Sequence, residues 1–193
     1  MNRLETARTI LRPYEPSDAP AAFAWFGDPE VMRLDPRGAD RSVADTQARL
    51  ESYIAHQRAH GFSKWIVLDR VDGRPIGHAG LMWLDSTGEV ELGYRLLRTV
   101  WGKGLATEVS RAWLESARQR LGLERVIAFT HPENVRSLAV MSRLGMRYAR
   151  TMRLQAADAA SVHAGGVPVD HLLDVVVFEF NLAARPGDPG RAP

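Results

Sequence analysis

The sequence contains no cysteine. This absence excludes disulfide bonds, zinc sites built on thiolates and a cysteine nucleophile. It does not indicate the redox compartment, because proteins without cysteine occur in oxidising and reducing compartments alike.

An excess of charge of one sign is also absent: 25 basic residues face 23 acidic ones, for a formal net charge of +2. Only two of the basic residues are lysines, Lys64 and Lys103. No basic stripe carries interleaved aromatic residues, so nothing favours a nucleic-acid partner. No apolar run approaches the roughly 18 residues of a membrane-spanning helix, and residues 1–6 lack the apolar segment of a signal peptide. We therefore expect a cytoplasmic protein with no nucleic-acid partner and no membrane partner.

The length of 193 residues suits one domain with a sizeable core. Its 45% of hydrophobic and 25% of charged residues are typical of soluble globular proteins. No internal repeat or domain linker interrupts the chain. The last residues are rich in proline and glycine, which predicts disorder. We predict a single domain over residues 1–182 and a disordered tail over 183–193.

Capping and turn residues divide the chain into elements. Ser17 is a candidate N-cap, Ser42 with Asp45 resembles a capping box, and Gly61 and Gly145 stand where helices are expected to end. From residue 62 the spacing of the apolar residues changes from the helical pattern to an alternating one, which is typical of a meander of strands. The predicted helices are 17–26, 42–61, 102–121 and 134–144, and the predicted strands are 9–13, 65–68, 76–83, 89–97, 126–130, 148–154 and 172–180, the last two joined by a Gly/Ala-rich loop at 156–169. These elements form one mixed α+β unit.

The most informative stretch runs from Leu96 to Glu108, where a strand ends, two glycines follow and a helix begins. The first turn of a helix has unpaired N–H groups and partial positive charge, so it binds phosphate. Gly102 and Gly104 lack a Cβ and let the backbone approach an anion closely. A P-loop is excluded because its upstream glycine and Gly-Lys-Ser/Thr ending are missing. A dinucleotide fingerprint is excluded because Thr107 occupies its last position and the preceding strand belongs to a meander.

These residues resemble motif A of the GNAT acetyltransferases, Q/R-x-x-G-x-G/A, at all but the first position, which is Trp101. With a tryptophan at this position, the sequence resembles the branch of the family that contains the ribosomal-protein alanine N-acetyltransferases. Further blocks of the branch follow in order over residues 4–180: Leu4–Pro13, Glu91-Leu92-Gly93-Tyr94, Trp101–Glu108, Asn134 with Ser137, and Leu144-Gly145-Met146. The resemblance implies a mostly antiparallel sheet of about six to seven strands, flanked by about four helices and with splayed central strands.

The resemblance also implies where acetyl-CoA binds. Backbone amides from Gly102 to Ala106 would hold its pyrophosphate, and Leu96–Arg98 would pair with its pantetheine amides like an added strand. The N–H of Leu96 would polarise the thioester carbonyl, and Asn134 would contact the cofactor arm. The full set of implied cofactor residues is Leu96, Leu97, Arg98, Trp101, Gly102, Lys103, Gly104, Leu105, Ala106, Thr107 and Asn134; no metal is implied.

The implied reaction is direct attack of a neutral amine on the thioester. Glu91, mid-strand beside the expected acceptor cleft, is the candidate base for the amine proton, with Tyr94, His131 or a water chain as alternatives. In many members of the family a tyrosine four residues before the Gly-Phe pair protonates the leaving thiolate. Here that position is Met141, which has no proton to give. Weaker candidates are His78, Asp170 and His171.

Several alternatives stay open at this level. The acceptor is a protein N-terminal amine or a small-molecule amine, and the sequence is compatible with a homodimer. Met141 keeps a second function open, that of a non-catalytic acyl-CoA-binding sensor. Intact Glu91-Leu92-Gly93-Tyr94 and Asn134 favour the enzyme.

Overall fold

The computed structural model describes residues 2–35, 37–154 and 174–183. Within these ranges the chain forms an eight-stranded sheet and five α-helices, which confirms the predicted α+β class. In chain order the elements are β1 (Leu4–Glu5), β2 (Thr9–Pro13), α1 (Ala19–Phe26), α2 (Pro29–Met32), α3 (Val43–His60), β3 (Lys64–Asp69), β4 (Pro75–Leu84), β5 (Glu89–Leu96), α4 (Leu105–Gln119), β6 (Arg125–Thr130), α5 (Val135–Leu144), β7 (Arg147–Arg153) and β8 (Asp174–Asn181). Short 3₁₀ turns at Pro16–Asp18 and Arg98–Val100 complete the set.

The sheet has the strand order β1-β2-β3-β4-β5-β6-β8-β7 and is antiparallel except between β5 and β6. β4 and β5 are paired along their length, from Gly77 with Leu96 to Leu84 with Glu89. β5 and β6 share a single partner pair, Glu91 with Ile127. Beyond that pair the two strands diverge, which confirms the expected splay. The divergence leaves a gap in the middle of the sheet.

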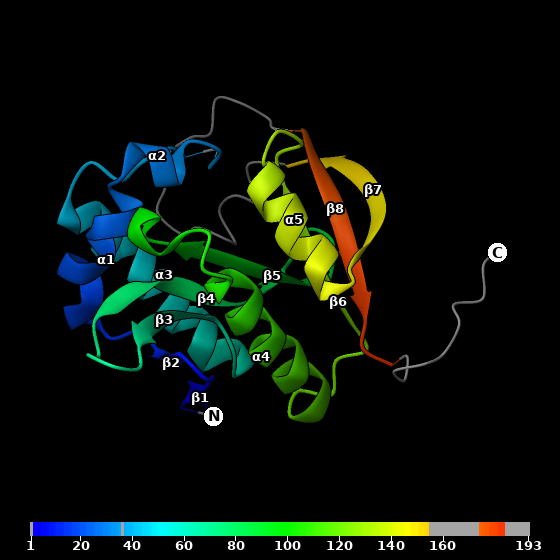
Figure 1. Ribbon diagram of the computed structural model, residues 1–193, viewed down its shortest axis with the longest axis horizontal. Coiled ribbons are helices and arrows are strands. Elements are labelled where there is room, and N and C mark those ends of the chain that lie inside the picture. Colours follow the sequence, from blue (N-terminus) through cyan, green and yellow to red (C-terminus); the bar gives the residue numbers. More distant parts are fainter. Residues whose placement is uncertain (1, 36, 155–173, 184–193) are drawn as a thin grey trace.

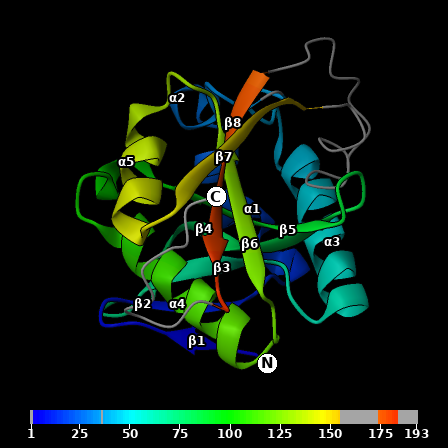
Figure 2. The ribbon, with the colours of Figure 1, turned by 90° about the vertical axis from the view of Figure 1, so that its right-hand side faces the viewer.

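Helices cover both faces of the sheet. Figure 2 shows α3 on one side of β3 and β4, with α4 and α5 on the other. One core lies between the sheet and α4 and α5, where the rings of Trp65 and Trp113 meet at 4.8 Å. A second core lies under α1 and α3. Because both faces are covered, β3 and β4 are buried almost continuously instead of on alternate residues. In Figure 1, α5 lies beside β6, β8 and β7, and α1, α2 and α3 are grouped at the other end.

The structure confirms the predicted ends of α3 and corrects the predicted start of the first helix. Ser42 accepts a hydrogen bond from the N–H of Asp45 at 3.1 Å, and Gly61 ends α3 with φ of 78°. Ser17, in contrast, caps no helix: it lies inside a 3₁₀ turn, and α1 begins at Ala19. The carboxylate of Asp18 forms this turn, because it accepts the N–H of Glu15 at 2.8 Å. The prediction of Ser17 as N-cap was therefore wrong.

The count of elements was also too low, by one strand and one helix. β1 spans two residues and α2 spans four, too short for any periodicity to show. α4 ends at Gln119, two residues before the predicted end.

The loop 156–169 and most of the predicted tail lie outside the described residues. None of the described helices has the length and apolar character needed to span a membrane.

The imidazole of His56 joins the end of α3 to the sheet. Its Nε2 accepts the backbone N–H of Trp83 at 2.9 Å, and its Nδ1 lies 2.8 Å from the carbonyl of Phe62. The ring is therefore neutral, with its proton on Nδ1. Burial lowers the pKa of His56 from 6.5 to about 4.

We expect the free energy of unfolding to fall as the pH drops from about 6.5 to about 4. In this window the unfolded chain takes up a proton at residue 56 and the folded chain does not. Above pH 6.5 this contribution is fully present. Because the ring is half-buried, solvent screening limits the loss to about 1 to 2 kcal/mol. Urea unfolding at a series of pH values measures it, and His56→Gln should flatten the curve there. An equal slope in both proteins would contradict the assignment.

Candidate active site

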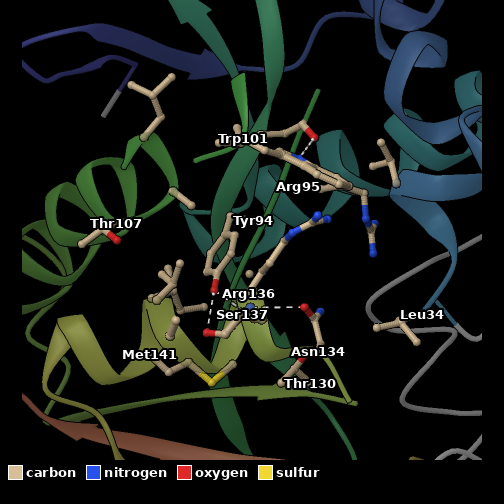
Figure 3. Close-up of a pocket in the computed structure, with 18 of the residues that line it drawn as sticks. Leu34, Tyr94, Arg95, Trp101, Thr107, Thr130, Asn134, Arg136, Ser137 and Met141 are labelled. Atoms are coloured by element: carbon tan, nitrogen blue, oxygen red, sulfur yellow. Dashed lines mark hydrogen bonds between the residues drawn. The ribbon is translucent and has the colours of Figure 1, made fainter. Parts of the chain in front are cut away.

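A cavity of about 1110 Å³ opens where β5 and β6 separate. Its wall is formed by β5, the loop that leads into α4, the end of β6, α5 and the segment around α2. Figure 3 shows side chains from these elements around the cavity. The predicted cofactor and catalytic residues that line it are Glu91, Leu96, Trp101, Gly102, Lys103, Gly104, Leu105, Ala106, Thr107 and Asn134, and the alternatives Tyr94, His131 and His78 line it as well, with Met141.

The loop before α4 presents backbone N–H groups to this cavity. Gly102 and Gly104 have φ values of 74° and 75°, a left-handed conformation that favours glycine. Gly104 is the N-cap of α4, and no side chain in the described part of the chain caps that helix. The N–H groups of Leu105 to Thr107 have no partner within the helix. This loop therefore offers several N–H donors and the positive end of a helix dipole to an anion.

The N-terminal segment holds this loop from outside. Arg8 donates to the carbonyl of Lys103 at 2.8 Å and pairs with Glu108 at 2.6 Å. Thr6 donates to the same carboxylate at 2.6 Å. Partial burial by itself would raise the pKa of Glu108, but the hydrogen bonds from Thr6 and Arg8 outweigh it and lower the pKa. The sequence did not predict these contacts of Thr6 and Arg8 with the loop and with Glu108, because the partners lie far apart in the chain.

The edge of β5 turns backbone groups toward the gap. The N–H of Leu97 donates to the carbonyl of Ile76 at 2.9 Å. Pairs in an antiparallel ladder alternate between hydrogen-bonded and non-hydrogen-bonded. The neighbouring pair, Leu96 with Gly77, is therefore of the second kind, and the N–H of Leu96 points away from β4 toward the diverging β6. The carbonyl of Leu96 accepts the indole N–H of Trp101 at 2.8 Å.

Leu97 and Arg98 are not among the residues that line the cavity. The N–H of Leu97 is taken by β4, as described above. Arg98 begins a 3₁₀ turn, and its guanidinium lies 3.9 Å from the carboxylate of Asp28. The chain therefore leaves the cavity wall after Leu96 and returns to it at Val100.

A cationic group from α5 reaches the same loop. The guanidinium of Arg136 lies over the ring of Trp101, 4.4 Å from its centroid. This cation–π contact joins α5 to the loop before α4 along the wall of the cavity. Lys103 is exposed at the same rim.

A buried ion pair lies on the other face of β5. Lys64 of β3 donates to Glu91 of β5 at 2.5 Å and to the carbonyl of Gly80 at 3.0 Å. Both side chains are less than a tenth exposed, yet both line the cavity. Burial lowers the pKa of Lys64, and Glu91 partly opposes that effect. The sequence identified Glu91 but not its partner, whose only signal is that it is one of two lysines.

Gly93 makes room for this ion pair. A Cβ at this position would lie 2.5 Å from Nζ of Lys64 and 2.6 Å from Oε1 of Glu91. In the acetyl transfer that the sequence resemblance implies, we expect Gly93→Ala to displace the two charged groups and to lower kcat about 10-fold or more, while the dissociation constant of acetyl-CoA stays the same. Steady-state kinetics and calorimetry on one preparation measure both. Unchanged kcat would mean that the position of the pair does not matter to turnover.

The similarity of this chain to other proteins identifies its family. Residues 8–147 match the family model of the acetyltransferase (GNAT) domain. The chain belongs to the GNAT family. It is 30% identical over 151 residues to an uncharacterised N-acetyltransferase, p20, of Bacillus licheniformis, covering 76% of this chain and 83% of p20.

Solved GNAT structures share the fold. The GNAT acetyltransferase of Bacillus anthracis superposes with a TM-score of 0.74 at 21% identity, over 93% of this chain and 98% of that one. A Vibrio cholerae protein, proposed to be a ribosomal-protein-serine acetyltransferase, superposes with a TM-score of 0.73 at 17% identity, over 94% and 99% of the two chains.

Tyr94 and Ser137 connect the two walls of the GNAT cavity. The hydroxyl of Tyr94, on β5, lies 2.9 Å from Oγ of Ser137, on α5. Burial raises the pKa of Tyr94 to about 12, although the hydrogen bond with Ser137 opposes this. The phenol therefore keeps its proton throughout the neutral range.

Asn134 and Met141 occupy the positions expected on α5. Asn134 caps this helix, because its Oδ1 accepts the N–H of Ser137 at 3.2 Å, and it also lines the cavity. Both expected roles are thus geometrically compatible. Met141 is buried and lines the cavity one turn after Ser137.

The histidine candidates are placed differently from one another. His131 lines the cavity and accepts the N–H of Glu133 at 3.2 Å through Nδ1. His78 also lines it, but it is buried against Phe26 and Tyr53. Asp170 and His171 lie outside the described residues. Within the described ranges, no group of three His, Cys, Asp or Glu side chains is arranged to hold a metal ion.

Proposed function

We propose that this GNAT protein transfers the acetyl group of acetyl-CoA to a primary amine by direct attack in a ternary complex. One observation supports this above all: an uncapped helix start and an unpaired strand edge line the same gap in the sheet. A pyrophosphate needs the first, and the amides of an extended pantetheine arm need the second.

Acetyl-CoA binds with its pyrophosphate on the N–H groups between Gly102 and Thr107. Its pantetheine arm runs beside β5, and its thioester carbonyl accepts a hydrogen bond from the N–H of Leu96. A donor held at that point stabilises the negative charge that the oxygen gains in the transition state. Arg136 and Lys103 add positive charge beside the phosphates.

The acceptor amine approaches from the side of α1 and α3, where Glu91 lies. An amine of high pKa arrives as ammonium and must lose a proton before it attacks. Glu91 takes this proton directly or through water. Because Lys64 already donates to Glu91, the carboxylate shares its charge with two partners when the amine arrives.

The acceptor is a protein N-terminal amine or a small-molecule amine. The wall near α2 carries the ion pair of Arg95 with Asp35, at 2.7 Å, together with Glu30 and Arg33. Charges of both signs favour a polar acceptor without selecting an acid or a base.

A mass-spectrometric screen of amine libraries with acetyl-CoA tests the function. We expect acetylated products from one class of amine, and initial-rate plots that intersect when both substrates are varied, because both must be bound before reaction. Parallel lines, or an acetylated protein formed from acetyl-CoA alone and competent for turnover, would contradict direct attack. Tight binding of acetyl-CoA with no product from any amine would favour the non-catalytic sensor instead.

A further inference from the structure

The phenol of Tyr94 lies in the wall of the cavity in which the proposed function places coenzyme A. β5 loses its neighbour β6 after Glu91, and Tyr94 follows three residues later. Its ring extends from β5 toward α5, as Figure 3 shows, and its hydroxyl meets Ser137 at 2.9 Å. Leu96, whose N–H faces the same gap, is two residues further along the strand. In the proposed complex the sulfur is bonded to the carbon whose oxygen Leu96 holds.

The wall of the cavity carries several side-chain donors, among them Tyr94, Asn134 and Arg136. Met141 has a thioether, which accepts weakly and has no proton to donate. Oδ1 of Asn134 caps α5 and leaves Nδ2 as its donor at the start of that helix, whereas the phenol of Tyr94 is a donor on β5 itself, two residues before Leu96. The contact between Tyr94 and Ser137 allows either hydroxyl to be the donor. When Ser137 donates, the phenolic proton has only the long contact to the Ser137 carbonyl, at 3.4 Å, and can turn to a group in the cavity.

We propose that Tyr94 is a catalytic residue that donates a hydrogen bond to the coenzyme A sulfur as it leaves, and that Ser137 is a positioning residue for the phenol. This inference rests on the proposed acetyl transfer. As the C–N bond forms, the C–S bond breaks and sulfur takes its electron pair. The amine proton goes to Glu91 or water, and the phenol keeps its proton.

The phenol acts as a donor of a hydrogen bond and not as an acid. Burial holds the pKa of Tyr94 at about 12, whereas an alkyl thiol such as that of cysteine has a pKa of about 8.5. A proton therefore does not pass completely from Tyr94 to the thiolate. Hydrogen bonds to charged groups are stronger than those between neutral groups, so the phenol stabilises the thiolate more than the thioester. This difference lowers the barrier.

The test uses coenzyme A itself, without turnover. Thiolate formation by bound coenzyme A is followed by ultraviolet absorbance against pH in the wild type, in Tyr94→Phe and in Tyr148→Phe. Tyr148 is an exposed tyrosine on β7 whose hydroxyl lies 3.0 Å from Thr151, so its variant is the matched control. We expect the thiol pKa of bound coenzyme A to be about one to two pH units higher in Tyr94→Phe than in the other two proteins.

Activity gives a second readout. Tyr94→Phe should lower kcat about 10- to 100-fold with the dissociation constant of acetyl-CoA unchanged. Ser137→Ala should lower kcat less, because the phenol remains but is no longer held. Circular dichroism and the melting temperature establish that each variant is folded. If bound coenzyme A has the same thiol pKa in the wild type and Tyr94→Phe, the role of Tyr94 is overturned while acetyl transfer stands. If the wild type binds no coenzyme A, the proposed function itself fails.

Discussion

Gly104→Val is expected to raise the dissociation constant of acetyl-CoA at least about 100-fold. A valine at φ of 75° is strained, so the loop before α4 must change its conformation and turn its N–H groups away. Each hydrogen bond from the backbone to a phosphate that is lost costs about 1.5 to 3 kcal/mol of binding free energy. Isothermal titration calorimetry measures the change directly.

Gly73→Val is the control that separates the loss of acetyl-CoA affinity from the backbone strain that a valine causes at a left-handed φ. Gly73 also has a left-handed φ, 72°, and open space around its Cβ position, but it lies in a turn away from the cavity. Both variants should lose a similar free energy of unfolding, about 1 to 2 kcal/mol. Only Gly104→Val should lose acetyl-CoA affinity. Equal affinity in both variants would overturn the placement of the pyrophosphate.

Glu91→Gln is expected to lower kcat about 100-fold while acetyl-CoA affinity barely changes. The glutamine cannot take the amine proton. The defect should be partly relieved at high pH, where solvent deprotonates the amine instead. The control is Glu89→Gln: Glu89 is also a buried glutamate of β5, paired with Arg150 at 2.5 Å, but it does not line the cavity. Full kcat for Glu91→Gln between about pH 6 and 9, with the true acceptor, would mean that the base lies elsewhere.

Replacement of Lys64, the cation that pairs with Glu91, should lower the stability of the protein. Lys64→Met leaves Glu91 buried and unpaired, and we expect it to lower the free energy of unfolding by about 3 to 5 kcal/mol. The double variant Lys64→Met/Glu91→Gln should recover most of that loss, since it leaves no buried charge. Glu91→Gln leaves Lys64 buried without its carboxylate, so the melting temperature of that variant is measured as well, to separate a catalytic defect from a folding defect.

Local patterns predicted the elements of this fold that are long and marked by caps. α3 follows from Ser42 and Gly61, whose side chain and backbone determine where a helix begins and ends without help from the rest of the chain. β1 and α2 were missed because two and four residues carry no period. Ser17 was misassigned because the Asp18 carboxylate binds Arg12, on the preceding strand, as well as the turn.

The candidate site divides in the same way. The sequence by itself determined the loop from Trp101 to Thr107 and the cap at Asn134, because a helix start depends on neighbours in the chain. The tertiary structure alone decided that Lys64 pairs with Glu91, that Tyr94 meets Ser137, and that Leu96 turns its N–H toward the gap. These three contacts join residues on different elements. Whether the elements meet depends on strand register and on the divergence of β5 from β6, and neither is encoded in any short segment.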